Sequence, residues 1–162
     1  MKKLPIITAF ILTGLTSSSQ EYIQKWIPAV KAGIGIGLDD IYLLHGEIGA
    51  QLEYRQSEIF SWVGNFDIAG NFDTYYQEYY STQLSLSAGP RFYIKNTFFI
   101  GAGLGYIHTF DGEPYAGMLF NPYLGLNTRK FQFVLDVKAT AANAIAESFI
   151  SLMVAYKFGG NQ

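Results

Sequence analysis

The sequence predicts an all-β protein, an eight-stranded antiparallel up-and-down transmembrane β-barrel with short periplasmic turns and longer extracellular loops. Three observations predict it: apolar and polar residues alternate, the alternating segments are about ten residues long, and short and long connections alternate along the chain. Successive side chains of a strand point to opposite faces, so alternation separates an apolar surface from a polar one. Residues 43–55 show this best, with Leu44, Ile48, Ala50, Leu52 and Tyr54 on one face and His45, Glu47, Gln51, Glu53 and Arg55 on the other.

The expected strands occupy residues 26–38, 43–55, 58–67, 80–95, 97–110, 118–128, 131–138 and 150–158. Each has an apolar face and a face of Gly, Ser, Asn, Gln and a few charged residues, and the parity of the apolar face switches at the seventh strand. The apolar faces include, in order, Val30, Ile34 and Ile36; Leu44, Ile48 and Leu52; Phe60, Trp62 and Phe66; Leu84, Leu86 and Phe92; Phe98, Ile100 and Leu104; Phe120, Leu124 and Leu126; Phe131, Phe133 and Leu135; Leu152, Val154 and Tyr156.

The connections between these segments fit a barrel that crosses a membrane. Residues 56–57, 95–97 and 127–130 are short and polar, as periplasmic turns are, whereas 68–79, 111–117 and 140–147 are longer. The connection at 39–40 is a short exception. Pro90 and Pro122 each delete a donor from a closed sheet, so we expect a β-bulge at both.

Outward aromatic residues near the strand ends predict two belts at the level of the lipid headgroups. One belt is expected at Tyr54, Phe60, Phe92, Phe98, Phe131 and Phe158, and the other at Tyr42, Phe66, Tyr80, Phe110 and Phe120.

Composition limits the other possibilities. The 162 residues suit one domain, and a net charge of −2 without a Lys/Arg cluster gives no nucleic-acid surface. Aromatic residues make up 17% and charged residues 15%, against about 25% charged in an ordinary soluble domain. The chain has no cysteine, which excludes disulfides and thiolate metal sites.

Residues 1–19 resemble a cleaved signal peptide, which leaves 20–162 as a single barrel domain. Lys2 and Lys3 precede an apolar stretch from Leu4 to Leu15, and small serines follow it. That stretch of about twelve residues is too short for a membrane helix, which needs about twenty. An exported chain with barrel strands points to the bacterial outer membrane.

Two segments carry a specific resemblance. Ala88-Gly89-Pro90-Arg91-Phe92-Tyr93 and the Tyr156-Lys157-Phe158 end resemble the small outer-membrane β-barrels of the OmpA/OmpX-like superfamily, and the Ser-Ser-Ser-Gln region is similar to that of Bacteroidetes members. The resemblance implies that the barrel-assembly machinery reads Tyr156 and Phe158 as an assembly signal. It also implies outer-membrane lipid and lipopolysaccharide as the surroundings. A soluble lipocalin-type barrel would exchange the two faces, but its outer face would need many Lys and Glu residues.

The polar face supplies the first candidate site. We expect a lumen charge network of Lys31, His45, Glu47, Glu53, Arg91, Asp136, Lys138 and Lys157. It could line a narrow pore for ions or small solutes, or its members could pair and fill the interior as a plug. An eight-stranded barrel leaves room for little more than side chains, which favours the plug.

An enzyme site on the barrel wall is a second possibility, because some eight-stranded barrels, the lipid A deacylases, carry a serine–histidine esterase there. This chain offers only His108, with Thr82 on the adjoining strand and Glu113 in a loop. A histidine in an aromatic belt is the simpler explanation, so we expect no enzyme. We also expect no cofactor and, with two histidines and no cysteine, no metal site.

The third candidate is a tyrosine-rich loop containing Phe72, Tyr75, Tyr76, Tyr79 and Tyr80, which could contact a partner protein, a glycan or lipopolysaccharide. Alternatively, the strands extend and these rings form the upper belt. The sequence thus predicts a non-enzymatic structural or interaction protein, either a surface-binding barrel or an accessory subunit of a larger outer-membrane complex.

Overall fold

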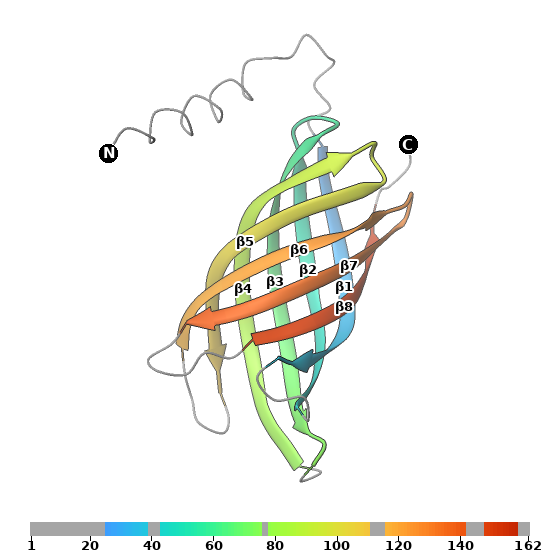
Figure 1. The fold of residues 1–162 in the computed structure, drawn as a ribbon. Coiled ribbons are helices and arrows are strands. Elements are labelled where there is room, and N and C mark those ends of the chain that lie inside the picture. The colour runs from blue at the N-terminus through green and yellow to red at the C-terminus, as the bar shows by residue number, and fades with distance from the viewer. Residues whose placement is uncertain (1–24, 39–42, 76–77, 111–115, 142–147, 159–162) are drawn as a thin grey trace, which may run out of the picture.

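Eight antiparallel β-strands form a closed barrel (Figure 1). The computed structural model describes residues 25–38, 43–75, 78–110, 116–141 and 148–158, with only the backbone described for 78–80 and 141. The strands are β1 (Lys25–Gly37), β2 (Leu43–Arg55), β3 (Phe60–Asp73), β4 (Glu78–Ile94), β5 (Phe98–Thr109), β6 (Ala116–Asn127), β7 (Phe131–Ala141) and β8 (Ser148–Lys157). Within these residues, no helix is long and apolar enough to cross a membrane.

The barrel closes where β1 pairs with β8. Their register runs from Ala29 opposite Lys157 to Gly37 opposite Phe149, and the Phe158 N–H donates to the Pro28 carbonyl at 2.8 Å. Every strand therefore has two hydrogen-bonded neighbours, and no sheet edge is left without a partner. The predicted strand number, order and direction are confirmed.

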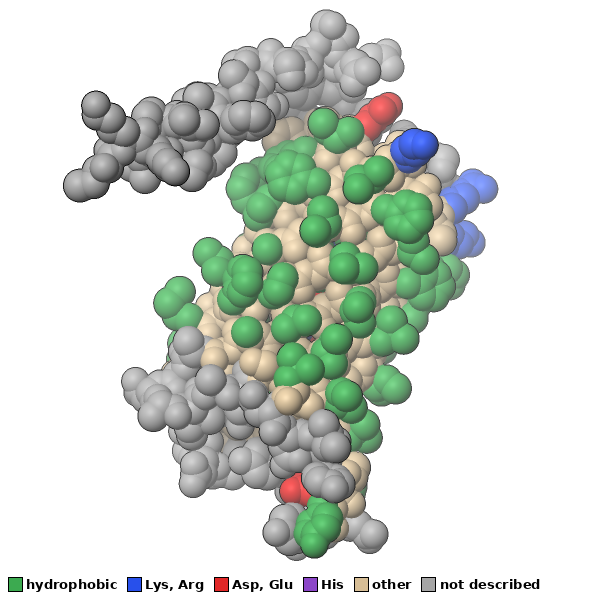
Figure 2. All heavy atoms as spheres, in the orientation of Figure 1, with side chains coloured by type: hydrophobic (Ala, Val, Ile, Leu, Met, Phe, Trp, Pro, Cys, Tyr) green, Lys and Arg blue, Asp and Glu red, His purple; other side chains and the backbone are tan. Residues whose placement is uncertain are grey.

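The two faces of the sheet are the reverse of those in a soluble protein. Outward side chains such as Ile34 and Leu104 are 67% and 63% exposed, while inward Arg91 and Glu53 are 1% and 0% exposed. Figure 2 shows hydrophobic side chains spread over the whole visible wall, with charged ones only towards its ends. So large an apolar surface is unfavourable in water and suits the hydrocarbon of a bilayer, so the fold is a transmembrane barrel rather than a lipocalin.

We call the end that holds the β2–β3, β4–β5 and β6–β7 turns the turn end, and the opposite end the loop end. The β4–β5 turn is a two-residue type I′ turn, because Lys95 and Asn96 have φ of 52° and 57° and the Thr97 N–H donates to the Ile94 carbonyl at 3.2 Å. Asn127 of the β6–β7 hairpin donates its backbone N–H to the Thr97 carbonyl and its side chain to the Asn96 carbonyl. These bonds fix the two turns against each other.

The long connection expected between the third and fourth strands is wrong, and the alternative that these strands extend is confirmed. The connection expected at 68–79 is instead strand down to residues 74–77, because β3 continues to Asp73 and β4 begins at Glu78. Figure 1 shows that this hairpin projects beyond the others at the loop end. Its extra length accommodates one register shift, between Asn71 and Phe72. Aromatic and polar residues with turn-like composition therefore continue the ladder, since paired backbone groups outweigh local turn preference.

The expected β-bulges at Pro90 and Pro122 are also absent. The register continues past each proline without an extra residue, although the ladder positions beside it are unpaired on one side. A missing donor removes a ladder bond but adds no residue, so the register is kept. The flanking pairs are Ala88–Leu104 and Arg91–Gly101 around Pro90, and Phe120–Ala139 and Tyr123–Asp136 around Pro122.

Inward glycines leave room for their neighbours. A Cβ on Gly101 would lie 2.5 Å from the ring of Tyr123, and one on Gly89 would lie 1.9 Å from the Ala102 carbonyl oxygen. The first glycine makes space for an interior aromatic ring. The second lets the backbones of β4 and β5 approach closely where the wall curves.

Lys95 gives a test of the turn. Lysine is disfavoured at positive φ, whereas asparagine is well tolerated there, so Lys95→Asn should stabilise the barrel by about 0.5–1 kcal/mol. Urea-induced unfolding in lipid vesicles would measure this. Lys130→Asn, in the neighbouring turn, is the control and should change stability little; equal effects of both would contradict the assigned turn geometry.

Candidate functional site

Arg91 on β4 organises the interior near the turn end. Its Nη1 donates to Glu53 Oε2 at 3.1 Å and to Gln132 Oε1 at 3.0 Å, and its Nη2 donates to Gln51 Oε1 at 3.1 Å. The Tyr93 hydroxyl donates to the other oxygen of Glu53 at 2.7 Å. Glu53 thus accepts a charge-assisted hydrogen bond from Arg91 and a second bond from the Tyr93 hydroxyl. These two bonds replace the hydrogen bonds to water that a buried carboxylate loses.

Aromatic rings enclose this ion pair. The Arg91 guanidinium lies 4.3 Å from the ring centroid of Phe99 and 5.0 Å from that of Tyr123. Phe99 and Tyr123 belong to a buried cluster with Tyr93, Val134 and Met153. Cation–π contacts of desolvated guanidinium groups are favourable, so the rings both fill the lumen and stabilise its charge.

A second cluster lies farther towards the loop end and centres on Lys138 of β7. Its Nζ bridges Glu47 Oε2 and Asp67 Oδ2, the latter at 3.2 Å. Lys31 also pairs with Asp67, at 2.8 Å. His45 connects Glu47, at 3.0 Å, to Asn71, at 2.7 Å, and stacks on Phe149 with 4.6 Å between ring centroids.

The structure thus brings most of the predicted charges together and adds Asp67, which sequence reasoning left out of the network. Alternation alone places Asp67 on the inner face, so the signal was present. Asp136 is different: its Oδ2 accepts a 3.4 Å bond from Asn121, and its Oδ1 has no hydrogen-bond partner among the described residues. In the described part of the chain, Asp136 forms no ion pair with any cation.

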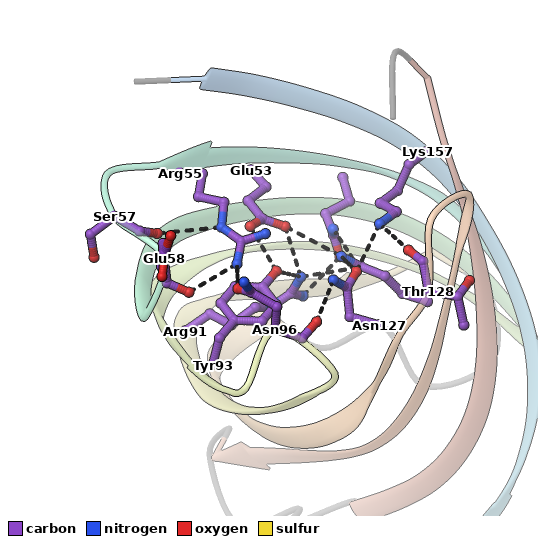
Figure 3. A network of polar contacts seen from close by, with 12 residues as sticks. Glu53, Arg55, Ser57, Glu58, Arg91, Tyr93, Asn96, Asn127, Thr128 and Lys157 are labelled. Atoms are coloured by element: carbon purple, nitrogen blue, oxygen red, sulfur yellow. Dashed lines mark hydrogen bonds and ion pairs between the residues drawn. The ribbon is translucent and has the colours of Figure 1, made fainter. Parts of the chain in front are cut away.

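Lys157 lies at the turn end rather than in either cluster. Its Nζ donates to Asn127 Oδ1 at 2.8 Å and to the Thr128 carbonyl. Nearby, Arg55 donates to the carbonyls of Ser57 and Glu58 and to the Asn96 side chain. Figure 3 shows how these side chains reach across the barrel mouth and join its turns.

Part of the lumen is apolar, which sequence reasoning missed. Inward residues of β5 to β8 include buried hydrophobic side chains, although they lie on faces expected to be polar: Phe99, Ile107, Leu119, Val134, Phe149 and Met153. Together with the ion pairs they occupy the interior, and every side chain of the predicted network is at most 8% exposed. This arrangement seals charge inside the barrel and leaves the outside apolar.

Two of the candidate enzyme residues, His108 and Thr82, lie on the outer wall. Leu84 is the register partner of His108, and the Thr82 carbonyl accepts from the Phe110 N–H at 2.9 Å, so Thr82 is a diagonal neighbour of His108. The His108 ring packs edge-on against Phe110, with 4.6 Å between centroids. Glu113 lies outside the described residues. Within the described chain, no group of His, Asp and Glu residues has a metal-binding arrangement.

The predicted tyrosine-rich segment spans the tip of the β3–β4 hairpin. Phe72, one residue before the end of β3, lies on the outer wall with 39% exposure. Tyr75 in the connection is 67% exposed, and its N–H donates to Asp73 Oδ1 at 2.8 Å. Tyr79 and Tyr80 belong to β4, but their side chains, like all of Tyr76, lie outside the described residues.

The outer wall holds the predicted assembly-signal residues. Tyr156 and Phe158 are exposed, and the Tyr156 ring packs against Phe131 and Phe158 with centroids 5.4 and 5.3 Å apart. The wall is also hollowed at small residues, in one shallow apolar depression around Gly64 and Ala88 and a second around Pro90, Ala102 and Pro122.

No protein-family model and no curated protein sequence matches the chain. Solved barrels do match. Ail of Yersinia pestis in a phospholipid nanodisc has a TM-score of 0.60 and 13% identity over 83% of this chain and 100% of that one. The N-terminal barrel domain of Pseudomonas aeruginosa OprF has a TM-score of 0.55 and 13% identity over 82% of this chain and 97% of that one. A de novo designed transmembrane β-barrel has a TM-score of 0.58 and 12% identity over 82% of this chain and 95% of that one.

At these identities the likeness shows the fold alone, which is that of small eight-stranded outer-membrane barrels. Ail is an attachment invasion locus protein, and a further structure of it contains the heparin analogue sucrose octasulfate, with a TM-score of 0.53 and 15% identity over 83% of this chain and 99% of that one.

The Arg91–Glu53 pair gives a stability test. Arg91→Met leaves a buried carboxylate without its cation and should lower the free energy of unfolding by about 3–5 kcal/mol. Arg91→Met/Glu53→Gln removes both charges and should recover much of that loss. Urea unfolding in vesicles measures both; a double variant no more stable than the single one would show that charge pairing is not the cause.

Proposed function

We propose that this protein is a non-conducting, non-enzymatic barrel of the bacterial outer membrane that acts through its outer surface. It would be exported by residues 1–19 and folded by the barrel-assembly machinery through Tyr156 and Phe158. It would then serve as a surface-binding protein or an accessory subunit of a larger outer-membrane complex. The outer-membrane location is supported by the likeness to Ail and OprF.

The filled lumen is the observation that carries this proposal. Lys138, Lys31 and Arg91 are each paired with buried carboxylates, and the turn-end mouth is crossed by Arg55 and Lys157. Opening a path for ions would require breaking several of these pairs at once and leaving charges unpaired in a low-dielectric interior. The alternatives of a narrow pore and a wall esterase have no comparable support, since the interior is occupied and His108 packs on a phenylalanine.

The outer surface offers two features for binding. The β3–β4 hairpin projects past the other strands and carries exposed Phe72 and Tyr75. The depression at Gly64 and Ala88 could receive a protruding side chain of a neighbouring membrane protein. A sulfated ligand such as that bound to Ail suits this chain poorly at the loop end, where the connections contain Asp and Glu but no Lys or Arg.

Conductance tests the closed lumen. The folded protein, inserted into planar bilayers, should give no steady current steps, because its interior charges are paired and buried. Heat-modifiable migration on gels would show in parallel that the inserted protein is folded. Reproducible steps from folded protein would overturn the proposal in favour of a pore.

Affinity purification distinguishes the two forms of the proposal. Tagged protein extracted from native outer membranes in mild detergent should bring down a stoichiometric membrane partner if it is an accessory subunit. Gly64→Leu, which fills the outer depression, should then reduce recovery, whereas Leu152→Val on β8, across the barrel, should not. Recovery of the barrel alone would leave the β3–β4 hairpin as the binding surface, to be tested with Tyr75→Ser.

A further inference from the structure

The charges of this barrel are segregated between its two ends. Every lysine and arginine from residue 25 onward lies either in the lumen, as Lys31, Arg91 and Lys138 do, or at the turn end. The turn-end cations are Lys25, Arg55, Lys95, Arg129, Lys130 and Lys157, and among the described residues the only acid of the turns there is Glu58. In Figure 2 the visible basic side chains gather at this end of the barrel.

Three of these cations come from turns that are held together. Lys95 lies in the β4–β5 turn, and Arg129 and Lys130 lie in the β6–β7 turn. The Asn127 N–H and side chain bond to the first of these turns at 2.6 and 2.9 Å, so the two turns form one platform. All three side chains are exposed, and no carboxylate among the described residues forms an ion pair with them.

Among the described residues, the neighbouring cations also lack acidic partners. Within this part of the chain, Arg55 donates to neutral oxygens, those of two carbonyls and the Asn96 amide. Lys25 is its register partner across β1 and β2. Like charges opposite each other destabilise a sheet, and an anion at this rim would relieve that repulsion.

The backbone conformation of Lys95 also supports an anion site at this rim. Its φ of 52° is a conformation that asparagine and glycine adopt more readily than lysine. A lysine at this position is unfavourable for the turn itself, so its charge is the property that distinguishes it from better turn formers.

Directly below the platform, the outer wall is apolar. Ile94, Phe98, Leu126 and Phe133 follow one another across four strands as register partners, and each is at least 42% exposed. Aromatic side chains at strand ends lie at the level of lipid headgroups. An anion held by the platform would therefore lie where acyl chains can run along this apolar row.

We propose that Lys95, Arg129 and Lys130 form a binding site for the phosphate group of anionic phospholipids, whose acyl chains pack against Phe98 and its neighbours. Lys25 and Arg55 extend the positive rim around the barrel. This inference needs only the transmembrane fold and stands apart from the proposed function. It makes the turn end the one that faces a phospholipid leaflet.

Lipid enrichment tests the site. The full-length folded protein is placed in nanodiscs of phosphatidylcholine with a minor fraction of phosphatidylglycerol, and bound lipids are counted by native mass spectrometry. Phosphatidylglycerol should be enriched, and Lys95→Gln/Arg129→Gln/Lys130→Gln should lower its affinity at least about tenfold, since each of the three cations attracts the anionic headgroup. Raising the salt concentration should weaken wild-type enrichment.

Matched variants separate the phosphate site from general effects. Glu58→Gln, which removes an acid at the same end, should keep or increase enrichment, and Lys95→Arg should preserve it. The triple variant should keep wild-type stability, because none of its three side chains has a hydrogen bond or ion pair in the described structure. No enrichment with the wild type, or equal enrichment with the triple variant, would overturn the proposal. The proposal would also be overturned if the triple variant lost an acidic protein that co-purifies with the wild type from native membranes while its phosphatidylglycerol enrichment stayed unchanged. That result would assign the cations to a protein partner.

Discussion

The barrel depends on one constraint: the polar inner faces of eight strands must satisfy one another in a space that holds side chains and little water. Lys138 between Glu47 and Asp67, and Arg91 against Glu53, meet this constraint with short ion pairs. Because the partners come from β2, β3, β4 and β7, these pairs connect opposite walls. Closure of the sheet therefore brings together the strands whose charges neutralise one another in the interior.

Because side chains fill the interior, the surfaces that can bind other molecules lie on the outside of the barrel. The wall is apolar and hollowed at Gly64 and Ala88, the loop end bears the projecting β3–β4 hairpin, and the turn end bears the cations. These three regions differ in chemistry, one suited to hydrocarbon or a membrane protein, one to an aromatic-binding partner and one to phosphate. A barrel of this kind can be held at a defined depth while it presents different surfaces to each side of a membrane.

Several departures from the sequence expectations have a common cause. Residues 68–73 have turn-like composition yet continue β3, and Pro90 and Pro122 leave the register unchanged. The inner faces of β5 to β8 are partly apolar, with Phe149 and Met153 buried beside charged residues. In each case the neighbouring strands decide the outcome, because ladder pairing and interior volume act over residues distant in sequence.

The sequence alone determined the number of strands, their order and the face of each side chain, because period-two alternation is local and a closed barrel of consecutive hairpins needs no long-range choice. It also placed Lys31, Glu47, Glu53, Arg91 and Lys138 inside. Only the tertiary structure decided which charges pair: among the described residues, Asp67 pairs with two lysines and Asp136 with none, and Lys157 reaches across the turn end. Those choices depend on the stagger between strands and on how far each side chain reaches across the lumen, which no local pattern encodes.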